Sequence, residues 1–140
     1  MVIPVLIEAL NNEARDVRMS AARILGGIGN SSVISALIKV LSDEDKFVRS
    51  SAISALGKIG DSSAVPALIK TLHDEDVWVR MSTIKVMGEF GTSAKEAVPA
   101  LIKLLNDKDE GIQSIAVEAL KNIGTPESVK AIEEYQNNAD

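Results

Sequence analysis

Ile28-Gly29-Asn30-Ser31-Ser32 is the stretch that decides the fold, because the chain repeats it. It returns as Ile59-Gly60-Asp61-Ser62-Ser63, then as Phe90-Gly91-Thr92-Ser93, and finally as Ile123-Gly124-Thr125. The glycines are separated by 31, 31 and 33 residues, and the last interval carries a two-residue insertion around Lys95-Glu96. Recurrence at a fixed period of this size is typical of structural repeats that stack on one another.

Two further strings keep the same register. One is a Val-Arg pair, found as Val17-Arg18, Val48-Arg49 and Val79-Arg80, and altered to Ile112-Gln113. The other is an apolar string, found as Pro4-Val5-Leu6-Ile7, Ser35-Ala36-Leu37-Ile38, Pro66-Ala67-Leu68-Ile69 and Pro99-Ala100-Leu101-Ile102. Three strings in one register predict a single domain, residues 1–140, with four repeats at about 2–32, 33–63, 64–96 and 97–124.

Each repeat has the pattern of two antiparallel helices. In the second repeat, apolar residues recur twice at helical spacing, as Ile34, Leu37, Ile38 and Leu41 and then as Val48, Ala52, Ala55, Leu56 and Ile59. Asp45 lies between the two stripes and suits the N-cap of the second helix. Gly60 follows the second stripe and suits the left-handed conformation that ends a helix. No stretch alternates with a period of two, so the sequence predicts an all-α fold.

Glycine also recurs inside the second helix of three repeats, as Gly26, Gly57 and Gly88. Glycine at such a position is about 1 kcal/mol less favourable than alanine, so its recurrence predicts close approach of neighbouring second helices. We therefore expect an α-solenoid in which each repeat buries its apolar face against the next.

The two ends of the predicted solenoid differ. Residues 126–138 have the pattern of a last, polar helix that caps the C-terminal end. The first repeat instead opens directly on apolar residues, Val2, Ile3, Val5 and Leu6, with nothing before them to cover their face. An uncovered apolar end predicts self-association through the N-terminal repeat, or an upstream repeat in a longer solenoid.

Composition excludes several classes of function. The 140 residues carry 15 Lys and Arg against 20 Asp and Glu, a formal net charge of -5, with no basic run, so we expect no nucleic-acid partner. The absence of cysteine excludes a disulfide scaffold, thiolate zinc and a cysteine nucleophile. No apolar run reaches the roughly 18 residues of a membrane span, and the start lacks the features of a signal peptide. We expect a cytoplasmic protein with no membrane partner.

The sequence offers no constellation for catalysis. His73 is the one histidine, and the turn His73-Asp74-Glu75-Asp76 occupies the slot that Ser42-Asp43-Glu44-Asp45 fills in the preceding repeat. We interpret it as a turn with a helix cap and not as a metal site. The serine pair Ser62-Ser63 has no histidine within reach, so a Ser-His-Asp triad cannot form. Gly26-Gly27-Ile28-Gly29 ends a helix and lacks the lysine of a phosphate-binding loop. We therefore expect no enzyme, no catalytic residue, no metal and no cofactor.

Three motifs resemble a known family. They are Val-Pro-Ala-Leu-Ile-Lys-Thr-Leu at 65–72, Asp-Glu-Asp-Val-Trp-Val-Arg at 74–80 and Ala-Leu-Gly-Lys-Ile-Gly at 55–60. They are similar to the HEAT-like repeats of phycobilisome-lyase-type proteins, and the resemblance covers essentially the whole chain. It implies a right-handed α-solenoid with the first helices on the convex side and the second helices lining the concave side. Such repeats act mainly as scaffolds, and some members are subunits of bilin-attaching enzymes.

The resemblance also implies a ladder of buried polar contacts between the turn aspartate and the arginine of Val-Arg. The implied pairs are Asp43 with Arg49 and Asp74 with Arg80. Both ends of the chain depart from the pattern, as at Asn12, where the aspartate is replaced. We therefore expect the ladder only in the middle repeats.

One set of positions on the second helices varies between repeats while its neighbours do not. If the resemblance holds, these positions face the concave groove, and their residues are Met19, Arg23, Phe47, Ser50, Ser51, Ser54, Trp78, Met81, Ser82, Lys85 and Glu89. Phe47 and Trp78 lie one 31-residue period apart, so we expect them side by side, with Met19 and Met81 adjacent. Exposed Trp, Phe and Met together are typical of binding surfaces. In the alternative interpretation, the two rings fold over the interhelical turns and plug the ends of the core.

These residues predict a non-enzymatic scaffold that binds a protein or peptide in its concave groove. The alternative is a subunit of a bilin lyase, whose groove would receive a phycobiliprotein or its tetrapyrrole. For a lyase acting alone, Lys85 and Glu89 are the only ionisable groove residues beside Trp78.

Overall fold

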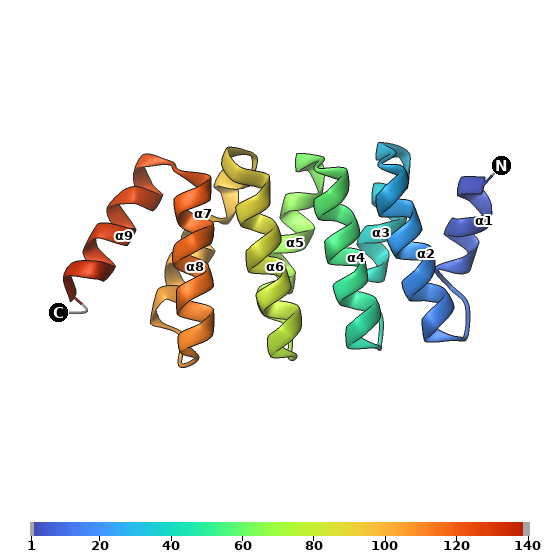
Figure 1. Ribbon diagram of the computed structural model, residues 1–140, viewed down its shortest axis with the longest axis horizontal. Coiled ribbons are helices and arrows are strands. Elements are labelled where there is room, and N and C mark those ends of the chain that lie inside the picture. Colours follow the sequence, from blue (N-terminus) through green and yellow to red (C-terminus); the bar gives the residue numbers. More distant parts are fainter. Residues whose placement is uncertain (1, 139–140) are drawn as a thin grey trace.

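The computed structural model describes residues 2–138, so positions 1 and 139–140 of the predicted domain lie outside it. The chain forms a row of helix pairs followed by one last helix (Figure 1). The first helices of the pairs are α1 (Val2–Ala9), α3 (Ile34–Val40), α5 (Val65–Thr71) and α7 (Val98–Lys103). The second helices are α2 (Arg15–Ile28), α4 (Lys46–Ile59), α6 (Val77–Phe90) and α8 (Glu110–Ile123), and α9 (Pro126–Asn138) ends the row. No strand occurs in residues 2–138, which confirms the predicted all-α solenoid.

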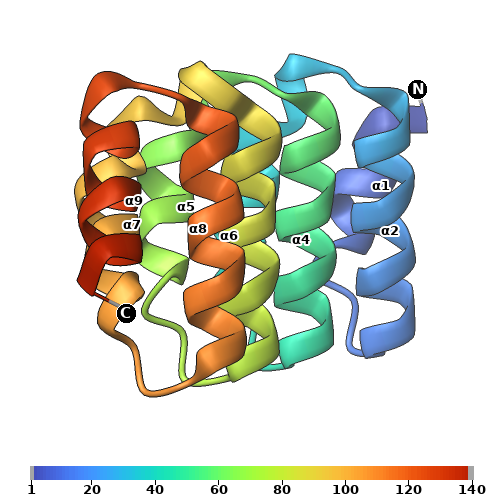
Figure 2. The same cartoon turned by 60° about the vertical axis from the view of Figure 1, so that its left-hand side comes forward.

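The helices form two layers. The second helices, α2, α4, α6 and α8, lie side by side in one layer, and the shorter first helices lie behind them (Figure 2). The core fills the space between the layers with fully buried aliphatic side chains such as Leu25, Leu56, Leu68 and Leu101. Helix α9 packs against α7 and α8 and covers the C-terminal end of this core.

Caps and glycines set the helix ends where the sequence predicts them. The Asp45 carboxylate accepts hydrogen bonds from the backbone N–H groups of Phe47 and Val48 and so begins α4. Gly60 ends α4 with a φ of 71° in the left-handed region. The short 3₁₀ turns before the first helices were not predicted. The insertion at Lys95-Glu96 lengthens one of them, η3 (Gly91–Ala97), to seven residues, against three in η1 (Ser31–Val33).

The second helices approach one another at the predicted glycines. A Cβ atom on Gly26 would lie 2.7 Å from the Cα atom of Ala55, which is closer than side chains allow. A Cβ on Gly57 would lie 3.1 Å from both methyl groups of Val86. At Gly88 the nearest atom would be the Cα of Ala119, also at 3.1 Å. Glycine therefore permits the close spacing of the second helices, α2, α4, α6 and α8.

The polar ladder forms, but its ion pairs join neighbouring repeats. Arg18 Nε donates to Asp43 Oδ2 at 2.8 Å, and Arg49 Nε donates to Asp74 Oδ2 at 2.9 Å. The expected polar contacts of Asp43 with Arg49 and of Asp74 with Arg80 do form, but to the backbone carbonyl of the aspartate and not to its side chain. Within a repeat the arginine binds only backbone, since Arg49 Nη1 donates to the carbonyl oxygen of Asp43 at 2.9 Å. The ladder also includes Arg18, so its restriction to the middle repeats is wrong.

The ladder stops at Arg80. Its Nη1 donates to the carbonyl oxygen of Asp74 at 2.7 Å, but no carboxylate in residues 2–138 lies within 4.0 Å of its guanidinium. In the earlier rungs a glutamate stands 3.9 Å from the arginine, as Glu75 does from Arg49. At the third rung, Asp107 stands at the position of the partner aspartate and Lys108 replaces the glutamate, so that accompanying carboxylate is absent there.

The positive φ of Gly60 makes a first prediction. Gly60→Ala places a Cβ in a conformation that is strained for L-residues, so we expect a loss of about 1 kcal/mol or more of unfolding free energy. Gly27→Ala is the matched control, because it lies inside α2 with no atom within 4 Å of the place its Cβ would take, and it should be neutral or stabilising. Urea unfolding of both variants checks this, and an unchanged or raised midpoint for Gly60→Ala would contradict it.

The ladder makes a second prediction. Arg49→Met leaves the nearly buried Asp74 carboxylate without its partner, which should cost about 3 kcal/mol. Arg80→Met loses the same kind of backbone contact but no ion pair, so its cost should be clearly smaller. Equal shifts in the urea midpoint of the two variants would show that the inter-repeat pair contributes nothing.

Candidate protein-binding groove

The predicted groove residues lie on the outer face of α2, α4 and α6, where they line two separate hollows. The first, called here the α2–α4 hollow, has a volume of about 400 Å³. It is lined by Met19, Arg23, Phe47, Ser50, Ser51 and Ser54, together with Ala55 and Lys58. Six of the eleven predicted residues therefore gather here, from two neighbouring helices.

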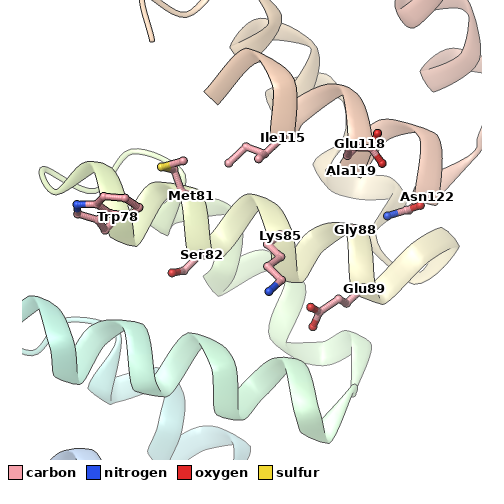
Figure 3. Close-up of a pocket in the computed structure, with 10 residues that line it drawn as sticks. All are labelled: Trp78, Met81, Ser82, Lys85, Gly88, Glu89, Ile115, Glu118, Ala119 and Asn122. Atoms are coloured by element: carbon pink, nitrogen blue, oxygen red, sulfur yellow. The ribbon is translucent and has the colours of Figure 1, made fainter. Parts of the chain in front are cut away.

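The second, called here the α6–α8 hollow, has a volume of about 440 Å³ (Figure 3). Helix α6 contributes Trp78, Met81, Ser82, Lys85, Gly88 and Glu89, and α8 contributes Ile115, Glu118, Ala119 and Asn122. Figure 3 shows Trp78, Met81 and Ile115 toward one end of the hollow and Glu89, Glu118 and Asn122 toward the other. The remaining five predicted residues gather here.

Sequence reasoning missed the contribution of α8. Ile115, Glu118 and Asn122 follow Ser82, Lys85 and Glu89 by 33 residues each, which is the spacing of the last two glycine strings. If the groove positions of the third repeat are moved forward by 33 residues, to allow for the insertion, all three α8 residues are identified. Lys58 of the other hollow is at the position that corresponds to Glu89, one 31-residue period earlier.

The two aromatic side chains are exposed but occupy different hollows. Phe47 is 49% exposed and lies with Met19, whereas Trp78 is 65% exposed and lies with Met81. The two rings thus stand on neighbouring helices, α4 and α6, but line different hollows. That they lie side by side stays a prediction. With about half of the Phe47 surface and most of the Trp78 surface in solvent, neither ring plugs the core.

The helix caps hold these rings in place. The Asp76 carboxylate accepts from the backbone N–H of Trp78 at 2.9 Å, so the bond that begins α6 also fixes the residue that carries the ring. Burial raises the pKa of Asp76, but hydrogen bonds from Val79 and Trp78 and the charge of Lys46 outweigh it and lower the pKa overall. The cap therefore stays ionised at neutral pH.

Phe47 is also held by two cations. The Arg15 guanidinium carbon lies 5.3 Å from the centre of the ring, and Lys46 Nζ lies 5.4 Å from it. Each cation also pairs with a capping carboxylate, Arg15 with Asp45 at 3.2 Å and Lys46 with Asp76 at 3.5 Å. Both cations are therefore already engaged at the edge of the α2–α4 hollow.

A family model of HEAT repeats matches residues 3–80 and again 65–140. The chain belongs to the HEAT-repeat family. A comparison with proteins of curated function finds no match. Among the described helices of this HEAT-repeat chain, none is both long enough and apolar enough to cross a bilayer.

Solved structures share the fold. The CpcE–CpcF complex of phycocyanin lyase from Nostoc sp. PCC7120 is 25% identical with a TM-score of 0.77, and the match covers 97% of this chain and 64% of that one. A designed armadillo repeat protein in complex with the peptide (KR)4 is 24% identical with a TM-score of 0.69, over 96% of this chain and 70% of that one. Kap121p bound to Ste12p is 17% identical with a TM-score of 0.73, over 98% of this chain and 16% of that one.

The N-terminal end of the HEAT-repeat array carries a second apolar surface. Val2 and Val5 of α1 are mostly exposed, and Ile24 of α2 is 42% exposed. A hollow of about 380 Å³ lies between the two helices, lined by Leu6, Ala9, Asp16, Val17, Ser20, Ala21 and Ile24. One period later, Ala55 stands at the position of Ile24 and is buried against α2. The exposed N-terminal face of the first repeat thus corresponds to the face that the second repeat buries against the repeat before it.

The exposure of Trp78 makes a third prediction. Trp78→Ala removes a ring that fills no core space, so we expect an unfolding free energy within about 1 kcal/mol of the wild type. Leu68→Ala, the control, empties a fully buried site and should cost about 2–5 kcal/mol. Thermal and urea unfolding of the two variants compare them directly. If Trp78→Ala unfolds as early as Leu68→Ala, the ring belongs to the core and the site is wrong.

Proposed function

We propose that this HEAT-repeat chain is a non-enzymatic scaffold that binds a segment of a partner protein across its concave groove. The observation that carries the proposal is the α6–α8 hollow, where an exposed Trp78 stands beside Met81 and Ile115. Large aromatic side chains at the edge of a pocket are the residues that most often supply the binding energy of an interface. The proposal includes the assignment of residues 1–140 to one domain of four repeats with a capping helix.

Most of the predicted groove residues are free to serve binding because the contacts between repeats do not use them. Met19 and Met81 are exceptions, since both also pack partly against the core. The interfaces between repeats are made by the buried stripes, the glycines and the arginine–aspartate pairs, such as Arg49 with Asp74. Phe47 and Trp78 stand outside these contacts. The fold itself is suited to the task, since a designed armadillo repeat protein of similar architecture holds the peptide (KR)4.

Selection from a random-peptide display library tests the proposal. The wild-type chain should enrich peptides that synthetic copies then show to bind, and Trp78→Ala should weaken that binding by about 2 kcal/mol, or some thirtyfold. Lys103→Ala, on an exposed residue of α7 in the layer behind the groove, is the control and should leave affinity unchanged. A library that yields no peptide whose binding depends on Trp78 would overturn the proposal.

The alternative function is a subunit of a bilin lyase. The observation that favours it is the similarity to the complex of CpcE and CpcF of phycocyanin lyase. Adding a free linear tetrapyrrole separates the two functions. A scaffold leaves the visible absorbance of the tetrapyrrole unchanged, whereas a shifted spectrum that Trp78→Ala abolishes would establish the alternative. A cytoplasmic location stays a prediction.

We also propose that the chain self-associates through its N-terminal face. Helix α9 and Lys121 occupy the opposite end, so a second copy meets this one N-terminal face to N-terminal face. About a two-fold axis, antiparallel α2 helices would place Val17 against the partner's Ile24 around the small residues Ser20 and Ala21.

Sedimentation velocity over a range of concentrations tests this contact. The wild type should form a dimer that Ile24→Glu dissociates, because the substitution places a charge in the apolar face. Val129→Glu makes the same change at an exposed residue of α9 at the other end and should leave the dimer intact. A wild-type chain that stays monomeric at its highest soluble concentration would contradict the proposal.

A further inference from the structure

The two hollows of the groove differ in charge. Arg23 and Lys58 line the α2–α4 hollow, both are exposed, and no carboxylate in residues 2–138 lies within 4.0 Å of either. The other cations at its edge, Arg15 and Lys46, are already paired with capping aspartates. This hollow therefore presents two uncompensated positive charges and no negative one.

The α6–α8 hollow has the opposite character. Its apolar end is formed by Trp78, Met81 and Ile115, and its polar end carries Glu89 and Glu118 (Figure 3). Lys85 supplies one positive charge between the two ends, so carboxylates outnumber cations in the lining. A partner that crosses both hollows thus meets basic side chains first, then an apolar pocket with acidic side chains beside it.

The distance between the hollows sets a spacing in the partner. From the α2–α4 hollow to the α6–α8 hollow is two helix-to-helix steps, roughly 16–20 Å for packed helices 8–10 Å apart. An extended peptide advances about 3.3 Å per residue, so about five or six residues cover this distance. A helix would need roughly 11–13 residues for the same distance, at 1.5 Å per residue.

The surface between the anchors favours an extended partner. Ser50, Ser51 and Ser54 of α4 are small and polar, which leaves room for a backbone to pass over the helix. The hydroxyls of Ser50 and Ser54, and the Asn122 amide in the other hollow, offer hydrogen-bond partners to the free N–H and C=O groups of an extended chain. The Ser51 hydroxyl donates to the Phe47 carbonyl and can still accept from an N–H.

We infer that the partner is an extended peptide segment in which an acidic side chain lies about five or six residues from a large apolar side chain that has a basic residue next to it. The acidic side chain binds Arg23 and Lys58. The apolar side chain enters the pocket of Trp78, Met81 and Ile115, and the basic residue faces the glutamates. This inference rests on the proposed function and specifies the partner of the same groove.

Library selection on charge-reversed chains tests the order of charges. Peptides selected on the Arg23→Glu/Lys58→Glu variant should no longer prefer an acidic residue at the first position and should prefer a basic one there. Their preference for a large apolar residue at the other position should be unchanged. A synthetic peptide selected on the wild type should bind this variant about tenfold more weakly, because two exposed ion pairs become repulsive. Lys70→Glu/Lys103→Glu makes the same change of net charge on α5 and α7, in the layer behind the groove, and should change neither preference nor affinity.

The possible outcomes distinguish a failure of this inference from a failure of the proposed function. Peptides that depend on Trp78 but show no acidic preference would overturn the charge order and leave the scaffold function standing. An acidic residue roughly 11–13 positions from the apolar one would overturn the extended conformation in favour of a helix. Selected peptides that are indifferent to Trp78 would overturn both the inference and the proposed function.

Discussion

The fold depends on the close spacing of its second helices, α2, α4, α6 and α8. Only residues with small side chains, or none, at the contact points permit this spacing. At Gly26 the backbone of α2 meets the backbone of α4 so closely that a single added carbon would overlap Ala55. The arginine–aspartate pairs then join the turns of the same neighbours, as Arg18 does with Asp43. Backbone contact in the middle of the helices and charge pairing at their ends together fix how one repeat sits on the next.

The same spacing explains why the groove is divided into two hollows. Where alanine faces the glycine, its side chain is too small to fill the space between the two helices on the groove side. Ala55 and Ala119 therefore become part of the hollow linings. Between α4 and α6 the facing residue is Val86, which packs both methyl groups onto Gly57 and lines neither hollow. The two hollows are therefore a consequence of how the repeats stack.

The sequence predicts the fold well because each helix end has a local cause. Asp45 and Gly60 act within a few residues of themselves, so their spacing is enough to place the ends of α4. The ladder could not be assigned in the same way, because register identifies which residues recur but not which neighbouring turn an arginine reaches. Arg49 has an aspartate six residues before it and another 25 residues after it, and only the folded chain shows that it pairs with the second. The residues of the candidate site could likewise be predicted from the repeat register, but the division of the site into two hollows could not. That division depends on whether valine or alanine faces the glycine of the neighbouring helix, as Val86 does in one place and Ala55 and Ala119 do in the others. The two side chains differ by two carbon atoms, and the effect of this difference appears only when the helices are packed.

Methyl-labelled methionine NMR offers the most direct measurement of whether this face binds, since the chain places its methionines in both environments. Met19 and Met81 lie one in each hollow, whereas Met87 is fully buried in the core. On addition of a selected peptide, the account predicts that the methyl signals of Met19 and Met81 shift while that of Met87 stays in place. Binding that shifts neither groove methionine, or that shifts Met87 alone, would contradict it.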